Sequence, residues 1–417
     1  MLSIIVSLLM LYSFELLLTS KFLKISHYGS ITHTDETSLK KRIKRANELG
    51  IFFDKRTKQE VIKEHTPYGY EITPNYHPYM LARDKINNNG LVGIDDSIFP
   101  LGGISNKVRV GRNETGKWMV YKADNYGFNN PINAFKRNVD IFLVGDSYTE
   151  GESVANDKNI ASILRDAGYD VYNCGMAGNG FLIEYATLVE YAKKIKPKNV
   201  FWIYSANDFA DFSNELNSDL LIKYLSDKNF SQGLTSKQAV IDSLLKKYMD
   251  MRYIDYLKQK KMSEWSFIST LRLIQVRKLL YRAKQNLYNY FKDNYSRNGD
   301  DVISENHNSK IMEAALLKKL RKLFINSKII TDQWGGKLFF VYLPSGNTYL
   351  VGREDPYKDH LKLLMKELDI DFIDLTNDFV NHEDPLSLFP LRMFEAHYNY
   401  NGYKLVADKI MNHLTEK

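Results

Sequence analysis

The 417-residue chain is long enough for one large domain with appendages, since 44% of its residues are hydrophobic and 13% are aromatic. Its formal net charge of +7 is modest and no basic run alternates with aromatic residues, so we do not expect a nucleic-acid-binding protein. The single cysteine, Cys174, excludes an intrachain disulfide. No residues have metal-ligand spacing, so we expect neither a metal nor another cofactor.

The first 20 residues are almost wholly apolar, broken only by Glu15 and small hydroxyl residues. This is close to the length that a helix needs to cross a bilayer. The Leu-Thr-Ser at 18–20 makes a poor cleavage site, so residues 1–20 are predicted to be an uncleaved transmembrane signal-anchor, with a buried N-terminal helix as the alternative. Lysines and arginines follow this segment and none precedes it, which by the positive-inside rule places the following chain in the cytoplasm.

Residues 21–135 are predicted to be a juxtamembrane helix and a lead-in region. From 39 to 56, charged and apolar residues alternate at helical spacing, which predicts a solvated helix. Between 68 and 133 the chain has turns and short strand-like pieces, including 108–110 and 118–121. The region is expected either to form one side of the active cleft or only to cover the edge of the sheet. Covering the sheet edge is the simpler expectation.

Five apolar runs predict a parallel sheet. They lie at 139–144, 170–174, 199–204, 336–343 and 371–375, and helix-like segments such as 360–368 separate them. This alternation predicts an α/β protein with a flavodoxin-like three-layer α/β/α sandwich. Residues 136–417 are expected to form this domain, with a mainly helical insertion at about 212–333.

Within the insertion, apolar residues between Leu271 and Phe291 recur every three or four positions, with arginines and lysines on the other side. This spacing predicts a basic amphipathic helix. Such a helix packs on its own domain, lies on an anionic membrane or binds a partner.

Side chains that can carry chemistry follow three of the predicted strands. Ser147 lies in Gly-Asp-Ser-Tyr-Thr-Glu-Gly at 145–151, where a following helix offers N–H groups to negative charge. Gly178 lies in a glycine-rich loop after the second strand, and Asn207 directly follows the third. A nucleophilic serine needs a base and oxyanion donors, and His397, just ahead of a helix-like segment, can supply the base. The alternatives are an ordinary turn and helix cap at Ser147 and a structural role for His397.

These four blocks, in this order, resemble the SGNH (GDSL) hydrolase family over roughly residues 124–417. The resemblance implies that Ser147 is the nucleophile and His397 the general base. It further implies an oxyanion hole formed by the N–H groups of Ser147 and Gly178 and the side chain of Asn207.

The acidic member of the triad departs from the usual pattern of the family. The family usually places an aspartate three residues before the histidine, where this chain has Phe394. A subset that includes alginate-acetylation enzymes has its acid two residues before, and Glu395 fits that spacing and completes the predicted triad. The alternatives are Asp384, reaching the site from a loop, and a Ser-His dyad in which a backbone carbonyl orients the ring. Asp146 is expected to orient backbone rather than act on substrate.

The resemblance implies a membrane-anchored serine esterase-type hydrolase that acts on ester bonds through an acyl-Ser147 intermediate, related to polysaccharide O-acetyl esterases and acetyltransferases. The expected substrate is an ester-bearing small molecule or polysaccharide, and O-deacylation of an exported glycan is the main expectation. Despite the charge bias, the catalytic domain is expected outside the cytoplasm, in a periplasm. An O-acyltransferase on a cell-surface polysaccharide and a catalytically silent scaffold subunit of polysaccharide export are the alternatives. Because the insertion follows Asn207, it is expected to form a lid over the Ser147 site.

Overall fold

The computed structural model describes residues 7, 10–13, 36–65, 75–93, 96–264, 280, 302–346, 355–393 and 397–415. The chain divides into two compact units. The larger comprises Thr34–Tyr248 and Leu317–Lys417, and the smaller comprises Met1–His33 and Met249–Leu316.

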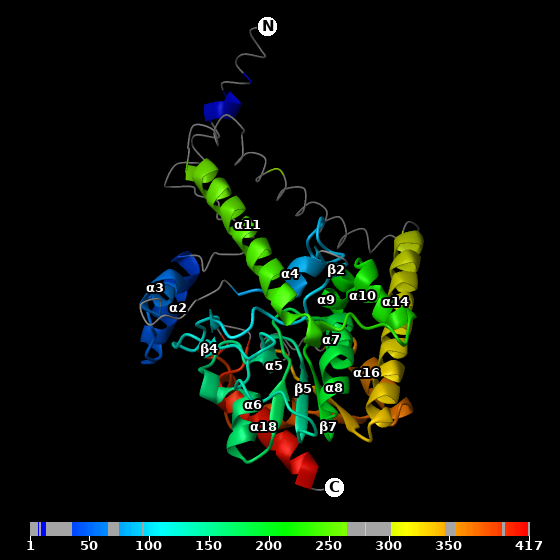
Figure 1. Cartoon of the computed structure of the whole chain (residues 1–417). Coiled ribbons are helices and arrows are strands. Elements are labelled where there is room, and N and C mark those ends of the chain that lie inside the picture. The colour runs from blue at the N-terminus through cyan, green and yellow to red at the C-terminus, as the bar shows by residue number, and fades with distance from the viewer. Residues whose placement is uncertain are drawn as a thin grey trace. The chain divides into compact units, whose positions relative to one another are not determined.

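A five-stranded parallel sheet forms the centre of the larger unit (Figure 1). Its strands, in spatial order, are β6 (Val171–Asn173), β5 (Ile141–Gly145), β7 (Asn199–Tyr204), β8 (Lys337–Tyr342) and β9 (Asp371–Asp374). Numbered along the chain, this order is 2-1-3-4-5, that of a doubly wound sheet. Nearly every residue of β5, β7 and β8 is buried because helices cover both faces, which explains their uninterrupted apolar runs. The structure confirms the predicted α/β class and parallel sheet.

Each face of the sheet packs on helices. On one face, Leu143 and Phe339 belong to a core that includes residues of α6 (Ile160–Asp166) and α18 (Tyr400–Thr415). On the other face, the Trp202 ring lies 6.5 Å from Phe181 of α7 (Phe181–Thr187) and 4.8 Å from Phe324 of α14 (Val302–Gln333). The sheet is therefore the middle one of three layers.

Further helices connect these elements. They are α5 (Ser147–Glu150), η2 (Asn156–Lys158), η3 (Leu188–Ala192), α8 (Lys193–Ile195), α9 (Asp208–Glu215), η4 (Leu234–Ser236), α16 (Lys358–Glu367), α17 (Thr376–Val380) and η5 (Pro385–Leu388). The helix predicted at 360–368 corresponds to α16, and the helix-like segment after His397 is part of α18.

In the part of the lead-in region that the structure describes, there are three helices and two antiparallel hairpins. They are α2 (Glu36–Glu48), α3 (Lys58–His65), α4 (Tyr79–Ala82), β1 (Leu91–Val92) with β2 (Ser97–Ile98), and β3 (Val108–Val110) with β4 (Val120–Lys122). The helix predicted for 39–56 was wrong in its second half: α2 ends at Glu48, and Gly50 has a φ of +66°, which a right-handed helix cannot accommodate. The helix is also not solvated all round, because Ile43 and Ala46 pack with Leu391.

The described part of the insertion is mainly helical, with α10 (Asp219–Ser226), α11 (Gln238–Glu264) and α14. The amphipathic helix predicted between 271 and 291 lies outside the described residues except for residue 280. Within the larger unit, the insertion contacts the lead-in region: Gln232 Oε1 accepts from the backbone N–H of Phe99 (2.8 Å), and Ser105 Oγ donates to Asp242 (2.6 Å). The lid over Ser147 stays a prediction.

The predicted signal-anchor lies outside the described residues, apart from residues 7 and 10–13, which are helical. Among the helices that the structure describes, none has both the length and the apolar character to span a bilayer.

Replacing Phe339 with alanine should reduce the free energy of unfolding by about 3–5 kcal/mol, because the change leaves a cavity in a close-packed core. The Phe339 ring is 2% exposed and stacks 4.7 Å from Phe201. Leu363→Ala is the control, since Leu363 is 63% exposed. Guanidinium denaturation measures both variants, and equal losses would contradict the assigned core.

Candidate active site

Ser147 is placed by the turn at the carboxyl end of β5. The strand ends at Gly145, where a Cβ atom would overlap the backbone oxygen of Ile203, so the close approach requires glycine. Asp146 caps α5 by accepting a hydrogen bond from the backbone N–H of Tyr148 (3.0 Å). Ser147 therefore begins a helix at the strand end, and 8% of its surface is exposed.

His397 faces Ser147 from near the other end of the chain. Its Nε2 lies 2.9 Å from Ser147 Oγ. The residues that follow His397 are fixed by hydrogen bonds: the Tyr398 hydroxyl donates to the backbone oxygen of Pro344 (2.6 Å), and Asn399 accepts from the backbone N–H two residues on (2.9 Å). The structure thus brings the predicted nucleophile and base together.

The carboxylate on the other side of the imidazole belongs to Glu114. Its Oε2 lies 2.9 Å from His397 Nδ1, although the two residues are 283 positions apart. Glu114 lies between β3 and β4, and Arg112 Nη1 is 3.6 Å from its other carboxylate oxygen. A carboxylate at Nδ1 fixes the tautomer that leaves Nε2 free to take a proton, and it stabilises the imidazolium that forms. Ser147, His397 and Glu114 therefore have the geometry of a triad.

The sequence does not reveal Glu114, because nothing in the loop at 112–116 distinguishes it from an ordinary turn. The residue that was predicted as the acidic member of the triad, Glu395, lies outside the described residues. The alternative acid, Asp384, binds Arg392 through both carboxylate oxygens (2.6 and 3.0 Å), and its side chain is 43% exposed.

Acidic neighbours control the protonation of His397. Burial opposes protonation of the imidazole, but the charge and hydrogen bond of Glu114 and the charge of Glu152 raise the pKa of His397 to about 9. Glu152 Oε2 lies 3.8 Å from His397 Nε2. Burial also opposes ionisation of Glu114, yet His397 and Arg112 lower the pKa of Glu114 to about 2. The resting site at neutral pH therefore holds an imidazolium.

A protonated imidazole changes what the serine hydroxyl can do. When His397 Nε2 carries a hydrogen it donates to Ser147 Oγ, so the serine hydrogen needs another acceptor. Asp146 Oδ2, 3.3 Å from Ser147 Oγ, is in place to accept it. This is a resting state, because an imidazolium cannot accept the proton of a nucleophile.

The predicted oxyanion donors lie on neighbouring turns. Ser147, Gly178 and Asn207 follow β5, β6 and β7, which are adjacent in the sheet. The Asn207 amide donates to Asp146 Oδ2 (3.1 Å) and to Asp211 Oδ2 (3.3 Å). Both of its hydrogens are therefore engaged, and one contact must break before Asn207 can serve an oxyanion.

The lead-in region forms part of the site, in addition to any cover of the sheet edge. Besides Glu114, it supplies Tyr121, whose hydroxyl donates to Glu150 Oε1 (2.9 Å), and His77, whose Nε2 lies 3.3 Å from Glu150 Oε2. Glu150 also accepts from the backbone N–H of Ala177 (2.8 Å), which holds the glycine-rich loop against α5. Of the two roles considered for this region, the contacts favour the wall of a site.

Among the described residues, no group of three or more His, Cys, Asp or Glu side chains could hold a metal ion.

No protein-family model matches the chain, and no curated protein matches it. The site is defined by its chemistry: a serine hydroxyl, an imidazole and a carboxylate in line at the carboxyl edge of a parallel sheet. This is the arrangement by which a serine becomes a nucleophile.

An NMR titration of His397 should give a pKa near 9. Glu114→Gln should lower that pKa by about one unit or more, because it removes a negative charge and an ionic hydrogen bond that favour the imidazolium. Glu152→Gln should lower it less, and Asp384→Asn, the control, should leave it unchanged. An unchanged pKa in Glu114→Gln, or a lowered one in Asp384→Asn, would reassign the acid.

Proposed function

We propose that the protein is a serine esterase-type enzyme that cleaves ester bonds through an acyl-Ser147 intermediate. The observation that carries the proposal is the continuous contact from Ser147 Oγ through His397 to Glu114, with two distances of 2.9 Å. All three groups are almost completely buried, so the contacts are little weakened by solvent.

In the proposed reaction, neutral His397 takes the proton of Ser147 as Oγ attacks the ester carbonyl. The carbonyl π electrons move to the oxygen, and N–H donors at the carboxyl edge of the sheet stabilise the oxyanion. When the carbonyl re-forms, the ester C–O bond breaks and His397 gives its proton to the departing alcohol. Water or a second alcohol, deprotonated by His397, then attacks the acyl-enzyme. The acyl C–Oγ bond breaks, His397 returns the proton to Ser147 Oγ, and the acid or the new ester is released.

Membership of the SGNH family is part of the proposal. It is supported by the four blocks in order and by a sheet order in which Ser147 and Asn207 follow β5 and β7, on either side of the switch point where doubly wound proteins bind ligands. By this assignment the N–H groups of Ser147 and Gly178 and the Asn207 amide are the oxyanion donors. The Asn207 amide would leave Asp211 when substrate binds.

The proposed substrate is an O-acylated glycan outside the cytoplasm, with the enzyme held at the membrane by residues 1–20. Hydrolysis and transfer to a sugar hydroxyl share the same acyl-enzyme, so the acyltransferase alternative uses the same three residues. The missing aspartate and the large insertion favour the alternative of a silent scaffold subunit. Glu114 supplies a carboxylate at that place, which favours an enzyme.

The acyl-enzyme can be tested with p-nitrophenyl acetate and a fluorophosphonate probe. Ser147→Ala should abolish both turnover and labelling, and His397→Ala should reduce turnover by about 10³-fold or more because the base is lost. Glu114→Gln should cost about 10²-fold or more, whereas Glu395→Gln should cost little. A folded wild-type protein that neither turns over the ester nor labels would refute the proposal.

The rate should depend on pH through His397. Because the imidazole must be neutral to act as a base and its pKa is raised to about 9, kcat/KM should rise with pH and level off above about 9. Glu152→Gln should move this midpoint to lower pH, since it removes a charge that stabilises the imidazolium. A wild-type rate that is level between pH 6 and pH 9 would contradict a protonated resting His397.

A further inference from the structure

One short segment of the lead-in region, residues 77–83, contacts two of the turns that carry the predicted oxyanion donors. Tyr79 lies against the turn after β6: a Cβ atom at Gly178, where φ is +73°, would lie only 2.5 Å from the Tyr79 ring. Arg83, four residues further on, forms an ion pair with Asp211 of α9, the helix that follows β7. The segment therefore reaches the elements that follow both strands.

Arg83 is fixed between an aromatic ring and a buried carboxylate. Its guanidinium carbon lies 4.9 Å from the centre of the Tyr79 ring, and its Nη2 donates to Asp211 Oδ1. The Asp211 side chain is only 5% exposed, whereas that of Arg83 is 49% exposed. Burial raises the pKa of Asp211, and the charge and hydrogen bond of Arg83 lower it. Arg83 is thus a cation that favours the ionised form of this carboxylate.

Asp211 shares its carboxylate between Arg83 and the predicted oxyanion donor Asn207. Oδ1 accepts from Arg83, while Oδ2 accepts from the Asn207 amide (3.3 Å). In the proposed mechanism the Asn207 amide leaves Asp211 when substrate binds, so a buried carboxylate loses one of its donors. A buried charged acceptor is costly to leave without a partner. Arg83 stays bound to Oδ1 and lowers this cost.

We propose that Arg83 is a positioning residue of the oxyanion hole. By holding Asp211, it allows the Asn207 amide to exchange this carboxylate for the oxyanion. Arg83 acts through Asp211 and not on the substrate, and the exchange moves hydrogen bonds without making or breaking a covalent bond. The inference rests on the proposed ester chemistry at Ser147 and assigns a further residue to it.

The test measures steady-state turnover of p-nitrophenyl acetate by the full-length protein on the plateau above about pH 9, where His397 is neutral. Arg83→Gln should lower kcat about tenfold, the size expected when a buried charged group loses its partner. KM should stay near the wild-type value, because the oxyanion forms only as the reaction proceeds. Arg83→Lys keeps the charge and should retain more of kcat than Arg83→Gln.

A second substitution separates this role from a merely structural one. Adding Asp211→Asn to Arg83→Gln should restore kcat to within about threefold of the wild-type value. A neutral amide needs no cation, and its hydrogen bond to Asn207 is weaker than that of a carboxylate, so Asn207 can leave it. If Arg83 only stabilised the fold, the double variant would not recover, because the ion pair is lost in it as well.

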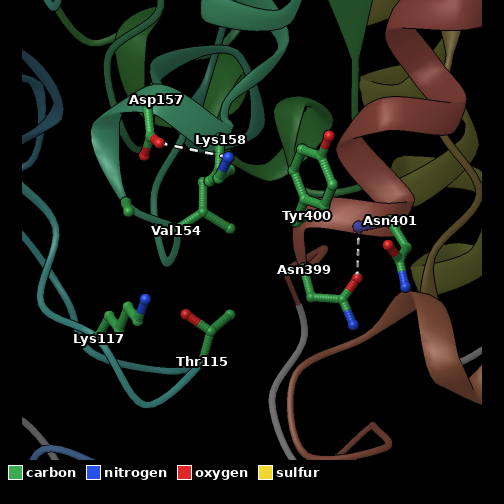
Figure 2. Close-up of a pocket in the computed structure, with 9 residues that line it drawn as sticks. Thr115, Lys117, Val154, Asp157, Lys158, Asn399, Tyr400 and Asn401 are labelled. Carbon is green, nitrogen blue, oxygen red and sulfur yellow. Dashed lines mark hydrogen bonds and ion pairs between the residues drawn. The ribbon is translucent and has the colours of Figure 1, made fainter.

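Lys158→Gln is the matched control. Lys158 is 46% exposed and lies 3.3 Å from Asp157, so the change also removes a half-exposed cation from an ion pair with an aspartate. Figure 2 shows this pair at a cavity whose lining contains neither Asp211 nor Asn207. The substitution should therefore leave kcat unchanged. Guanidinium denaturation of each variant shows that the proteins compared are folded.

Three results would each overturn the role of Arg83 while keeping the esterase: a wild-type kcat in Arg83→Gln, a loss that Asp211→Asn does not restore, or an equal loss in Lys158→Gln. A change confined to KM would do the same, because it would place Arg83 in substrate binding. A folded wild-type protein that neither turns over the ester nor labels with a fluorophosphonate would remove both proposals.

Discussion

The hydrogen bond between His397 and Glu114 is the contact on which the rest of the site depends. A buried carboxylate is unfavourable unless it is paired, and here the imidazolium and Arg112 compensate for its burial. The loop that carries Glu114 must therefore be held in register with the core. The Thr115 hydroxyl donates to the backbone oxygen of Ser153 (2.6 Å), which ties this loop to the segment that follows α5. The same contact joins the acid side of the triad to the serine side.

Helix α2 links the two loops that meet at the imidazole. Arg42 Nη1 donates to the backbone oxygen of Asn113 (3.5 Å), next to Glu114, and Arg45 Nε donates to the backbone oxygen of Leu391 (3.3 Å). Leu391 begins a run of three non-glycine residues with φ of +50°, +56° and +68°, a conformation that costs about 1–2 kcal/mol per residue. Such a turn persists only where its surroundings hold it. The packing of α2 on Leu391 and the Arg45 hydrogen bond help to stabilise this turn.

The sheet could be predicted from sequence because its strands are buried on both faces, and uninterrupted apolar runs are the direct consequence. Ser147 and His397 could be predicted because glycine, cap and helix signals surround them. Glu114 could not, since its role arises from a contact across 283 positions and its loop is short and polar. The end of α2 was missed for a similar reason: the charged and apolar alternation continues past Glu48, while the backbone turns at Gly50. Periodicity indicates local structure, and the contacts that complete a site are not local.

Asp146 lies among several buried carboxyl groups. Burial, together with the negative charges of neighbouring acids, raises the pKa of Glu184 and of Asp208 well above the usual range. The one hydrogen of the Ser205 hydroxyl has three acceptors in reach: Asn207 Oδ1 (2.6 Å), Asp146 Oδ2 (2.8 Å) and Asp208 Oδ1 (3.1 Å). Asp146 Oδ2 also accepts from the Asn207 amide (3.1 Å), and the Ser147 hydroxyl lies 3.3 Å from it. Deprotonation of His397 gives the Ser147 hydrogen a stronger acceptor at Nε2. In the proposed mechanism, the serine O–H then rotates from Asp146 toward His397.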